Sequence, residues 1–315
     1  MADMIKHPEF IKMFDGYDTT RLPNADFEWA AKGGGGDAVL LFGSEKTALF
    51  DTGMAYIAEE VIENIKKILA AHGREKVDYV FVSHTHYDHI GALPYVLDEW
   101  LDAVVYGSAK AQYVFTRPGA LNFIKEMGIE AAKEFGRDDL VDKVKTEGLR
   151  VDQVLADGDT VSLGNYTITA METKGHTDCC MSYGVDPGKI LFASESSGVV
   201  VPQLGVTGSE ILKSTQDALD ACDKCEAYGP AEIICPHYGS IPTDYIPHYF
   251  ETMREDAQMK KDFIAAKNAE GLDADQILEA YADWLYVPGE QPKAAFMANA
   301  VNIVNVMLWE VQNEQ

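Results

Sequence analysis

The chain has 315 residues and carries 51 acidic against 26 basic side chains, a formal net charge of −25. Hydrophobic residues make up 47% of it, enough for a sizeable core, and this excludes a chain that is disordered throughout. A surface this acidic repels nucleic acid and anionic membranes, so we expect neither as a partner. No uninterrupted apolar run approaches the roughly 18 residues that a membrane span needs.

The first half of the chain alternates short apolar strands with helices. A flexible turn at Gly33–Gly36 precedes the first strand, and apolar residues at helical spacing followed by Gly73 mark the first long helix. Strands are predicted at 38–42, 47–51, 79–82 and 103–106, and helices at 55–71, 93–100 and 108–136, the last broken by Pro118 and Gly128.

The second half repeats this alternation and then becomes purely helical. Hairpins are predicted at 160–172 and 181–192, followed by a helix at 211–227 and a strand at 233–235. Helices are predicted at 249–269, 273–286 and 294–311. The pattern favours a layered α/β domain over residues 1–243. Residues 244–315 would form a helical appendage that covers an active site, makes a homodimer contact, or does both.

The five cysteines predict a reducing environment. An odd number of cysteines without an N-terminal apolar signal segment favours free thiols and a cytoplasmic location. Cys222 and Cys225 form a CxxC, which could be a redox pair or half of a zinc site. No second CxxC completes such a site, so we interpret them as two small residues on adjacent turns of the predicted helix.

The strongest chemical signal is the sequence Ser-His-Thr-His-Tyr-Asp-His-Ile-Gly at residues 83–91. It places His84, His86, Asp88 and His89 within six residues, directly after a predicted buried strand. Imidazole and carboxylate groups are good ligands for divalent ions. Burying these four side chains without a partner would cost several kcal/mol. The motif therefore predicts a metal site.

This string resembles the HxHxDH motif of the metallo-β-lactamase superfamily. Further pieces follow in the family's order, over roughly residues 38–240: Asp51-Thr52-Gly53, Gly175-His176-Thr177, Leu191 to Glu195, and Pro236-His237-Tyr238-Gly239. The resemblance implies a four-layer αββα sandwich of the metallo-β-lactamase type, with the C-terminal helices as an extension.

The resemblance also implies a ligand set for two divalent metal ions. His84, His86 and His176 would bind the first metal, Asp88, His89 and His237 the second, and the residue at position 195 would bridge them. Zinc is the first expectation, with iron or manganese as alternatives. In this family Asp51 holds the ligand loop in place. His248, His7 and His72 match no motif and are predicted to be surface residues.

Glu195 departs from the family pattern, because the bridging residue is usually Asp and Ser194 stands where Gly is usual. Glu is one methylene longer. It could bridge with altered metal spacing, which could favour iron or manganese over zinc. It could instead bind one metal only, or hold a metal weakly.

The implied activity is hydrolysis of a small ester, thioester or phosphoester by a hydroxide that bridges the metals. Asp88 would be the catalytic residue that orients this nucleophile or passes a proton to the leaving group. No GxSxG motif offers a serine nucleophile. One alternative is a di-iron redox enzyme related to the flavodiiron core, which reduces oxygen or nitric oxide, although those proteins usually carry Glu where this chain has His86. The other is a non-enzymatic ligand sensor on the same fold.

Overall fold

The computed structural model describes residues 4–33, 36–287 and 293–313, and its chain folds around two six-stranded sheets. The first sheet has the order β1-β2-β3-β4-β5-β6. Its strands are β1 (Phe27–Ala31), β2 (Ala38–Phe42), β3 (Thr47–Phe50), β4 (Tyr79–Phe81), β5 (Val104–Gly107) and β6 (Gln153–Val154). β3 to β6 are parallel, whereas β1 and β2 form antiparallel pairs.

The second sheet has the order β14-β13-β10-β9-β8-β7. Its strands are β7 (Thr160–Ser162), β8 (Thr167–Glu172), β9 (Met181–Asp186), β10 (Ile190–Phe192), β13 (Glu232–Cys235) and β14 (Gly239–Ser240). Of these pairs only β10 and β13 run parallel. A separate hairpin is formed by β11 (Val199–Val201) and β12 (Val206–Gly208).

The two sheets pack face to face through an aromatic core. The alternation of side chains along β2 sends Val39 and Leu41 into this core and its other residues to the opposite face. Phe50 of the first sheet stacks on Phe192 of the second, with 3.8 Å between ring centroids. Such a pair contributes about 0.5–1.5 kcal/mol beyond its buried area. This contact joins the ends of β3 and β10, which are followed by Asp51 and Glu195.

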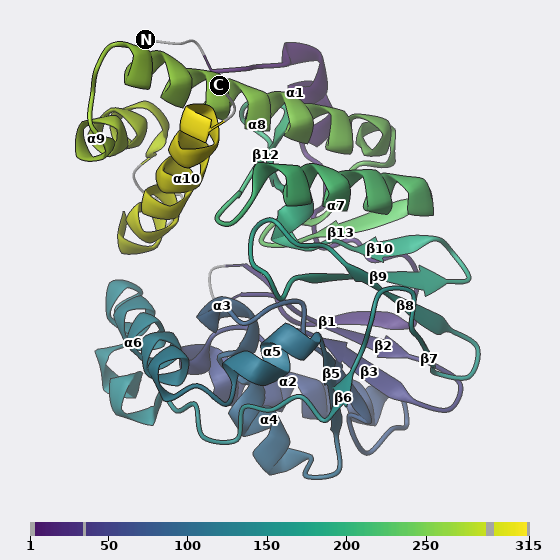
Figure 1. The fold of residues 1–315 in the computed structure, drawn as a ribbon. Coiled ribbons are helices and arrows are strands. Elements are labelled where there is room, and N and C mark those ends of the chain that lie inside the picture. Colours follow the sequence, from purple (N-terminus) through teal and green to yellow (C-terminus); the bar gives the residue numbers. More distant parts are fainter. Residues whose placement is uncertain (1–3, 34–35, 288–292, 314–315) are drawn as a thin grey trace.

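Helices cover the outer face of each sheet and complete four αββα layers (Figure 1). The first sheet is covered by α2 (Ala58–Ala71), α4 (Leu93–Glu99) and α5 (Ala109–Val114), with α3 (Tyr87–Ile90) and α6 (Pro118–Glu134) beside them. The second sheet is covered by α7 (Thr215–Tyr228) and α8 (Ile246–Ala269). The layered α/β sandwich expected from the sequence is confirmed.

The C-terminal helices α9 (Ala274–Leu285) and α10 (Lys293–Asn313) pack with α8. One hydrophobic cluster joins these helices to α7 and β13, so residues on both sides of position 244 share a core. α10 has the length and composition of a membrane span, with a mean hydropathy of 1.3, and a third of that stretch is buried inside the protein. Its inward face includes Phe296, Ile303 and Met307. The division at 244 stays a prediction.

Several elements differ from the sequence prediction. α6 runs through Gly128 because this glycine lies against Val144, where a Cβ would approach a methyl group to 3.1 Å. α7 begins at Thr215 rather than residue 211, since Leu212 and Lys213 donate their backbone N–H groups to the Gly175 carbonyl. β1, the β11–β12 hairpin, β14 and α1 (Pro8–Phe14) were not predicted. The turn predicted at 33–36 includes residues 34 and 35, which lie outside the described residues.

Candidate metal centre

The HxHxDH segment leaves the end of β4 and runs into the short helix α3. Asp51, just after β3, holds its beginning: one carboxylate oxygen accepts the Ser83 N–H at 2.8 Å and the other accepts the Ser83 hydroxyl at 2.6 Å. The second oxygen also lies 2.8 Å from Nδ1 of His89. Asp51 has a φ of 51°, an uncommon conformation for a residue other than glycine. This strained residue therefore orients the ligand loop, as the resemblance implies.

Three loops of the second sheet bring the remaining candidates to the same place. His176 lies between β8 and β9, Glu195 follows β10, and His237 follows β13 with a φ of 61°. Glu195 opens a 3-10 turn over Glu195–Ser197. Ser194 fits before it because its hydroxyl lies 2.8 Å from the Thr173 hydroxyl. The side chain that replaces the family's usual glycine thus has a buried polar partner.

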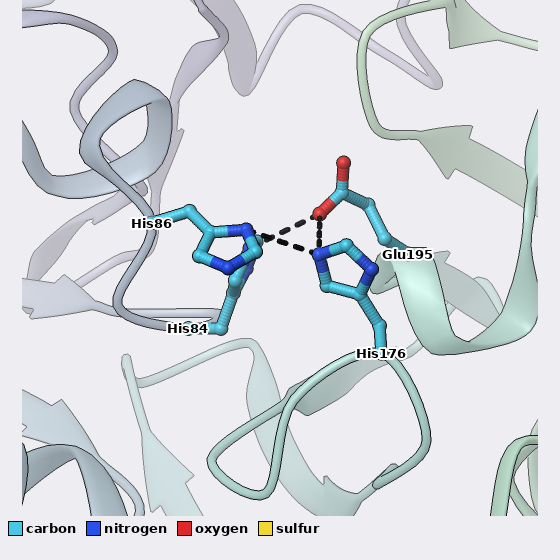
Figure 2. A group of neighbouring side chains, drawn as sticks. All are labelled: His84, His86, His176 and Glu195. Carbon is cyan, nitrogen blue, oxygen red and sulfur yellow. Dashed lines mark hydrogen bonds and ion pairs between the residues drawn. The ribbon is translucent and has the colours of Figure 1, made fainter. Parts of the chain in front are cut away.

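The first group of donors comprises His84, His86, His176 and Glu195, whose donor atoms lie within 4.8 Å of one another (Figure 2). Glu195 Oε2 is 2.8 Å from His176 Nε2 and 3.0 Å from His84 Nε2. Nδ1 of His86 is 3.1 Å from His176 Nε2. Two ligands of a tetrahedral zinc ion are about 3.3 Å apart at bond lengths of 2.0–2.1 Å. These separations suit a cation between them.

The facing atoms of His84 and Glu195 show that this group fits a metal ion. The Ser83 hydroxyl donates to Asp51 and lies 3.1 Å from His84 Nδ1, so Nδ1 carries the hydrogen and Nε2 a lone pair. His84 Nε2 and Glu195 Oε2 are both buried and neither has a hydrogen-bond partner among the described residues. Two buried acceptors that face each other are costly without a cation between them.

The second group comprises Asp88, His89, Glu195 and His237. Glu195 Oε1 lies 2.7 Å from His237 Nε2, while Asp88 Oδ2 lies 3.5 Å from the same nitrogen and 3.7 Å from His89 Nε2. The two ring nitrogens of His89 and His237 are 3.3 Å apart. Glu195 thus offers Oε2 to the first group and Oε1 to the second. All seven residues expected from the sequence converge here, and their ligation of metal stays a prediction.

The two groups differ in their protonation. Burial lowers the pKa of His84 well below its usual value and that of His86 to about 4, so both rings are neutral at pH 7. Burial also acts against a charged His89, but the carboxylates of Asp88 and Asp51 outweigh it and raise the pKa of His89 to about 10. Without a metal, His84 and His86 therefore offer lone pairs while His89 holds a proton.

Glu195 controls the charge of the two histidines nearest to it. Burial would raise the pKa of Glu195, but His176 and His237 together hold it well below its usual value. In return Glu195 outweighs burial, raising the pKa of His176 and raising that of His237 to about 9. A divalent cation would replace the protons on His176 and His237 as the partner of the Glu195 carboxylate.

Backbone groups also fix the ligands, and sequence reasoning missed them. His176 Nδ1 lies 2.7 Å from the Glu210 carbonyl oxygen, and the His237 N–H donates to Asp37 Oδ2 at 2.9 Å. Gly36 lies so close to the Asp88 carbonyl that a Cβ would come within 2.2 Å of it. Every residue type has a backbone carbonyl, so the sequence gives no sign of the contact made by Glu210. Asp37, a polar residue between a glycine run and an apolar strand, was the one visible signal.

Cys222, Cys225 and His248 belong to neither donor group. Cys222 and Cys225 are buried on α7, where burial raises the pKa of both thiols, that of Cys225 to about 11. Cys222 lies 3.3 Å from the Met253 sulfur, in a packing environment rather than a metal cluster. His248 stacks on Phe10, with 4.1 Å between centroids.

Relatives of this chain include enzymes of two kinds. A probable metallo-hydrolase of Burkholderia pseudomallei is 31% identical over 160 residues, which cover 46% of this chain and 46% of that protein. A coenzyme F420H2 oxidase of Methanocaldococcus jannaschii is 28% identical over 190 residues, which cover 60% of this chain and 37% of that protein. The matched region spans less than half of either relative.

Solved structures and a family model agree on the fold. A metallo-beta-lactamase family protein of Thermus thermophilus superposes with a TM-score of 0.65 at 16% identity, over 93% of this chain and 95% of that one. The model of the metallo-beta-lactamase superfamily matches residues 31–237, which include all seven candidate ligands. The chain therefore belongs to the metallo-beta-lactamase superfamily.

Proposed function

We propose that this protein is a binuclear metallohydrolase acting on a small ester, thioester or phosphoester. The observation that carries the proposal is the pair of donor groups that share Glu195, one carboxylate oxygen directed to each. A shared carboxylate would hold two cations close together, as in two-metal hydrolytic sites. When bound, such cations supply a hydroxide nucleophile at neutral pH and polarise the substrate oxygen.

The side chains of the two groups would have different roles, metal binding in the first group and proton transfer in the second. In the first group His84, His176 and Glu195 are buried and His86 is partly exposed, so these side chains would bind their cation largely away from solvent. In the second group the side chains of His237 and Asp88 are 31% and 16% exposed. Asp88 is therefore placed to accept a proton from the nucleophile and to return it to the leaving group. Substrate would approach from this more exposed side.

The charge of the protein favours a small substrate over a polyanion. With a net charge of −25, the surface repels nucleic acid, whereas a small anionic or neutral ester need only enter the field of the metal centre. α3, which carries Asp88 and His89, packs against α6. α6 in turn meets the first residue of α10, where the Lys293 N–H donates to Glu134. We propose that these helices border the site and limit the substrate's size.

A substrate panel with defined metal loading tests the proposal. Purified protein is stripped by chelator, reloaded with zinc, manganese or iron, and assayed on ester, thioester and phosphoester substrates. We expect saturable turnover that chelator abolishes and His86→Ala removes. His248→Ala, a histidine outside both groups, is the matched control and should keep activity. A panel without turnover by protein that contains two metals per chain would contradict hydrolysis.

A di-iron redox activity is the second candidate. It is favoured by the match to the coenzyme F420H2 oxidase of Methanocaldococcus jannaschii, which is named as a redox enzyme. This chain combines two carboxylates with five histidines, a donor set that also suits iron. Iron-loaded protein that consumes oxygen or nitric oxide with an electron donor, and cleaves no ester, would favour this candidate over hydrolysis.

A further inference from the structure

The loop between β12 and α7 is held by two charged residues of α8, which lies beside β12 (Figure 1). Ser209 is fully buried, and its N–H and O–H both donate to Asp256 Oδ2 at 2.7 Å. Its carbonyl oxygen accepts from Lys260 Nζ at 2.6 Å. All the polar groups of Ser209 are thus bound by two side chains one helical turn apart.

The next residue of the same loop touches a candidate metal ligand. The Glu210 carbonyl oxygen lies 2.7 Å from His176 Nδ1. A carbonyl oxygen can only accept, so Nδ1 of His176 carries a hydrogen and Nε2 is the atom left to bind a cation. That Nε2 lies 2.8 Å from Glu195 Oε2, inside the first donor group. The position of the loop therefore sets both the tautomer and the direction of this imidazole.

The Asp256–Lys260 pair is not explained by stability alone. The two charges are 2.9 Å apart and both residues are 5% exposed. Removing two charges from water costs several kcal/mol per ion, and apolar replacements of buried pairs are often neutral or stabilising. Burial would lower the pKa of Lys260, but Asp256 outweighs burial and raises it, so the ammonium keeps its charge. A role in holding Ser209 rigidly in place would explain why the protein keeps this costly pair.

We propose that Asp256 and Lys260 are positioning residues of the metal centre, acting through Ser209 and the Glu210 carbonyl on the imidazole of His176. The inference rests on the proposed ligation of metal by His176. Both residues lie beyond position 237, where the family match ends. The C-terminal helical region thus orients a ligand of the first donor group, besides packing on the second sheet.

Cobalt substitution of the full-length protein tests this role. In the Co²⁺ protein, the Nδ1–H of a ligating histidine gives a paramagnetically shifted resonance, and that of His176 is assigned by its loss in His176→Ala. For Lys260→Met we expect faster solvent exchange of this resonance. We also expect Co²⁺ affinity of the first donor group to be about 10- to 100-fold weaker, as is typical when an outer partner of a ligand is lost.

Two further variants separate positioning from folding. Lys267→Met makes the same change on the same helix, at a lysine that pairs with the exposed Glu270, and should alter neither readout. Asp256→Asn keeps the shape and an acceptor oxygen for Ser209, so it is the test if Lys260→Met fails to fold. We expect it to speed exchange of the His176 resonance to a smaller extent.

The possible outcomes distinguish this inference from the proposed function. If wild-type protein bound no Co²⁺ through His176, both proposals would be overturned. Suppose that wild-type protein shows the His176 resonance and that both α8 variants are folded before metal is added. If the two variants then had the Co²⁺ affinity and the exchange rate of wild type, only the positioning role would be overturned. A lower unfolding temperature with unchanged affinity and exchange would assign the pair to the fold alone.

Discussion

The two donor groups share Glu195, yet they differ in burial and in the origin of their ligands. In the first group the side chains of His84 and His176 are 0% and 1% exposed, whereas His237 in the second is 31% exposed. The first group is also the one with two histidines made neutral by burial. This difference suggests a tightly held cation in the first group and a more exchangeable one, facing substrate, in the second.

Removal of one ligand from each group is the largest expected effect. His86→Ala should abolish activity. It should weaken metal binding in the first group by more than the roughly 10- to 100-fold loss of affinity that is typical when an outer partner of a ligand is removed, and so lower the metal content. His237→Ala should also abolish activity but leave the buried cation in place. Elemental analysis after dialysis against a chelator measures both. Normal metal content in both variants would refute the ligand assignment.

Shortening the shared carboxylate tests whether the reach of Glu195 matters. In Glu195→Asp the side chain loses one methylene, so one carboxylate can no longer meet His176 and His237 at 2.8 and 2.7 Å without a shift of the loop. We expect metal binding to be retained with a changed preference among zinc, iron and manganese. The readout is competition between these metals at equal concentration. Identical profiles for wild type and variant would show that the longer side chain has no effect on metal choice.

Metal uptake should release protons, mainly from the second group. His89 and His237, with pKa values of about 10 and about 9, must each lose a proton to bind. We expect about two protons released per chain at pH 7 and an apparent affinity that rises with pH. Calorimetric titration in buffers of different ionisation enthalpy counts the protons.

The same shifts fix the sign of the stability change in the metal-free protein. Because the folded-state pKa values are raised, these two histidines stabilise the fold fully below pH 6.5, and that contribution is lost as the pH rises through about 9 and 10. His237→Ala, which should lose the second cation, should release about two protons fewer than wild type, because His89 then keeps its proton as well. Equal proton release by both proteins would argue against titration at His237.

The smallest expected effect concerns the backbone of the second group. Asp37 accepts the His237 N–H at 2.9 Å and the Gly33 N–H at 3.1 Å, which helps to hold His237 at its positive φ. Asp37→Ala should weaken the binding of the second cation about 10-fold and leave the binding of the first unchanged. Stepwise metal titration separates the two affinities. Equal weakening of both cations would mean that the two groups are not independently anchored.

The sequence was most informative where ligands are close together in the chain. His84 to His89 could be assigned from spacing alone, and the layered fold from alternating strands and helices. His176 and His237 needed the family resemblance, because each is a single residue in its loop. The anchors provided by Glu210, Asp256 and Lys260 could not be predicted, since they depend on a backbone carbonyl and on the packing of α8 against β12.

Short elements were missed for a related reason. β11, β12 and β14 contain two or three residues each, too few for a periodic pattern. Gly128 was expected to break a helix, but its missing side chain allows α6 to approach Val144 instead. Local composition could not distinguish a break from close packing, because the difference lies in a distant segment.

The most direct test of a shared carboxylate between two cations is a crystal of metal-loaded protein measured at the absorption edge of the bound metal. We predict two anomalous peaks per chain, one among His84, His86 and His176 and one among Asp88, His89 and His237, with Glu195 between them. A single peak, or peaks that Glu195 does not contact, would contradict the account.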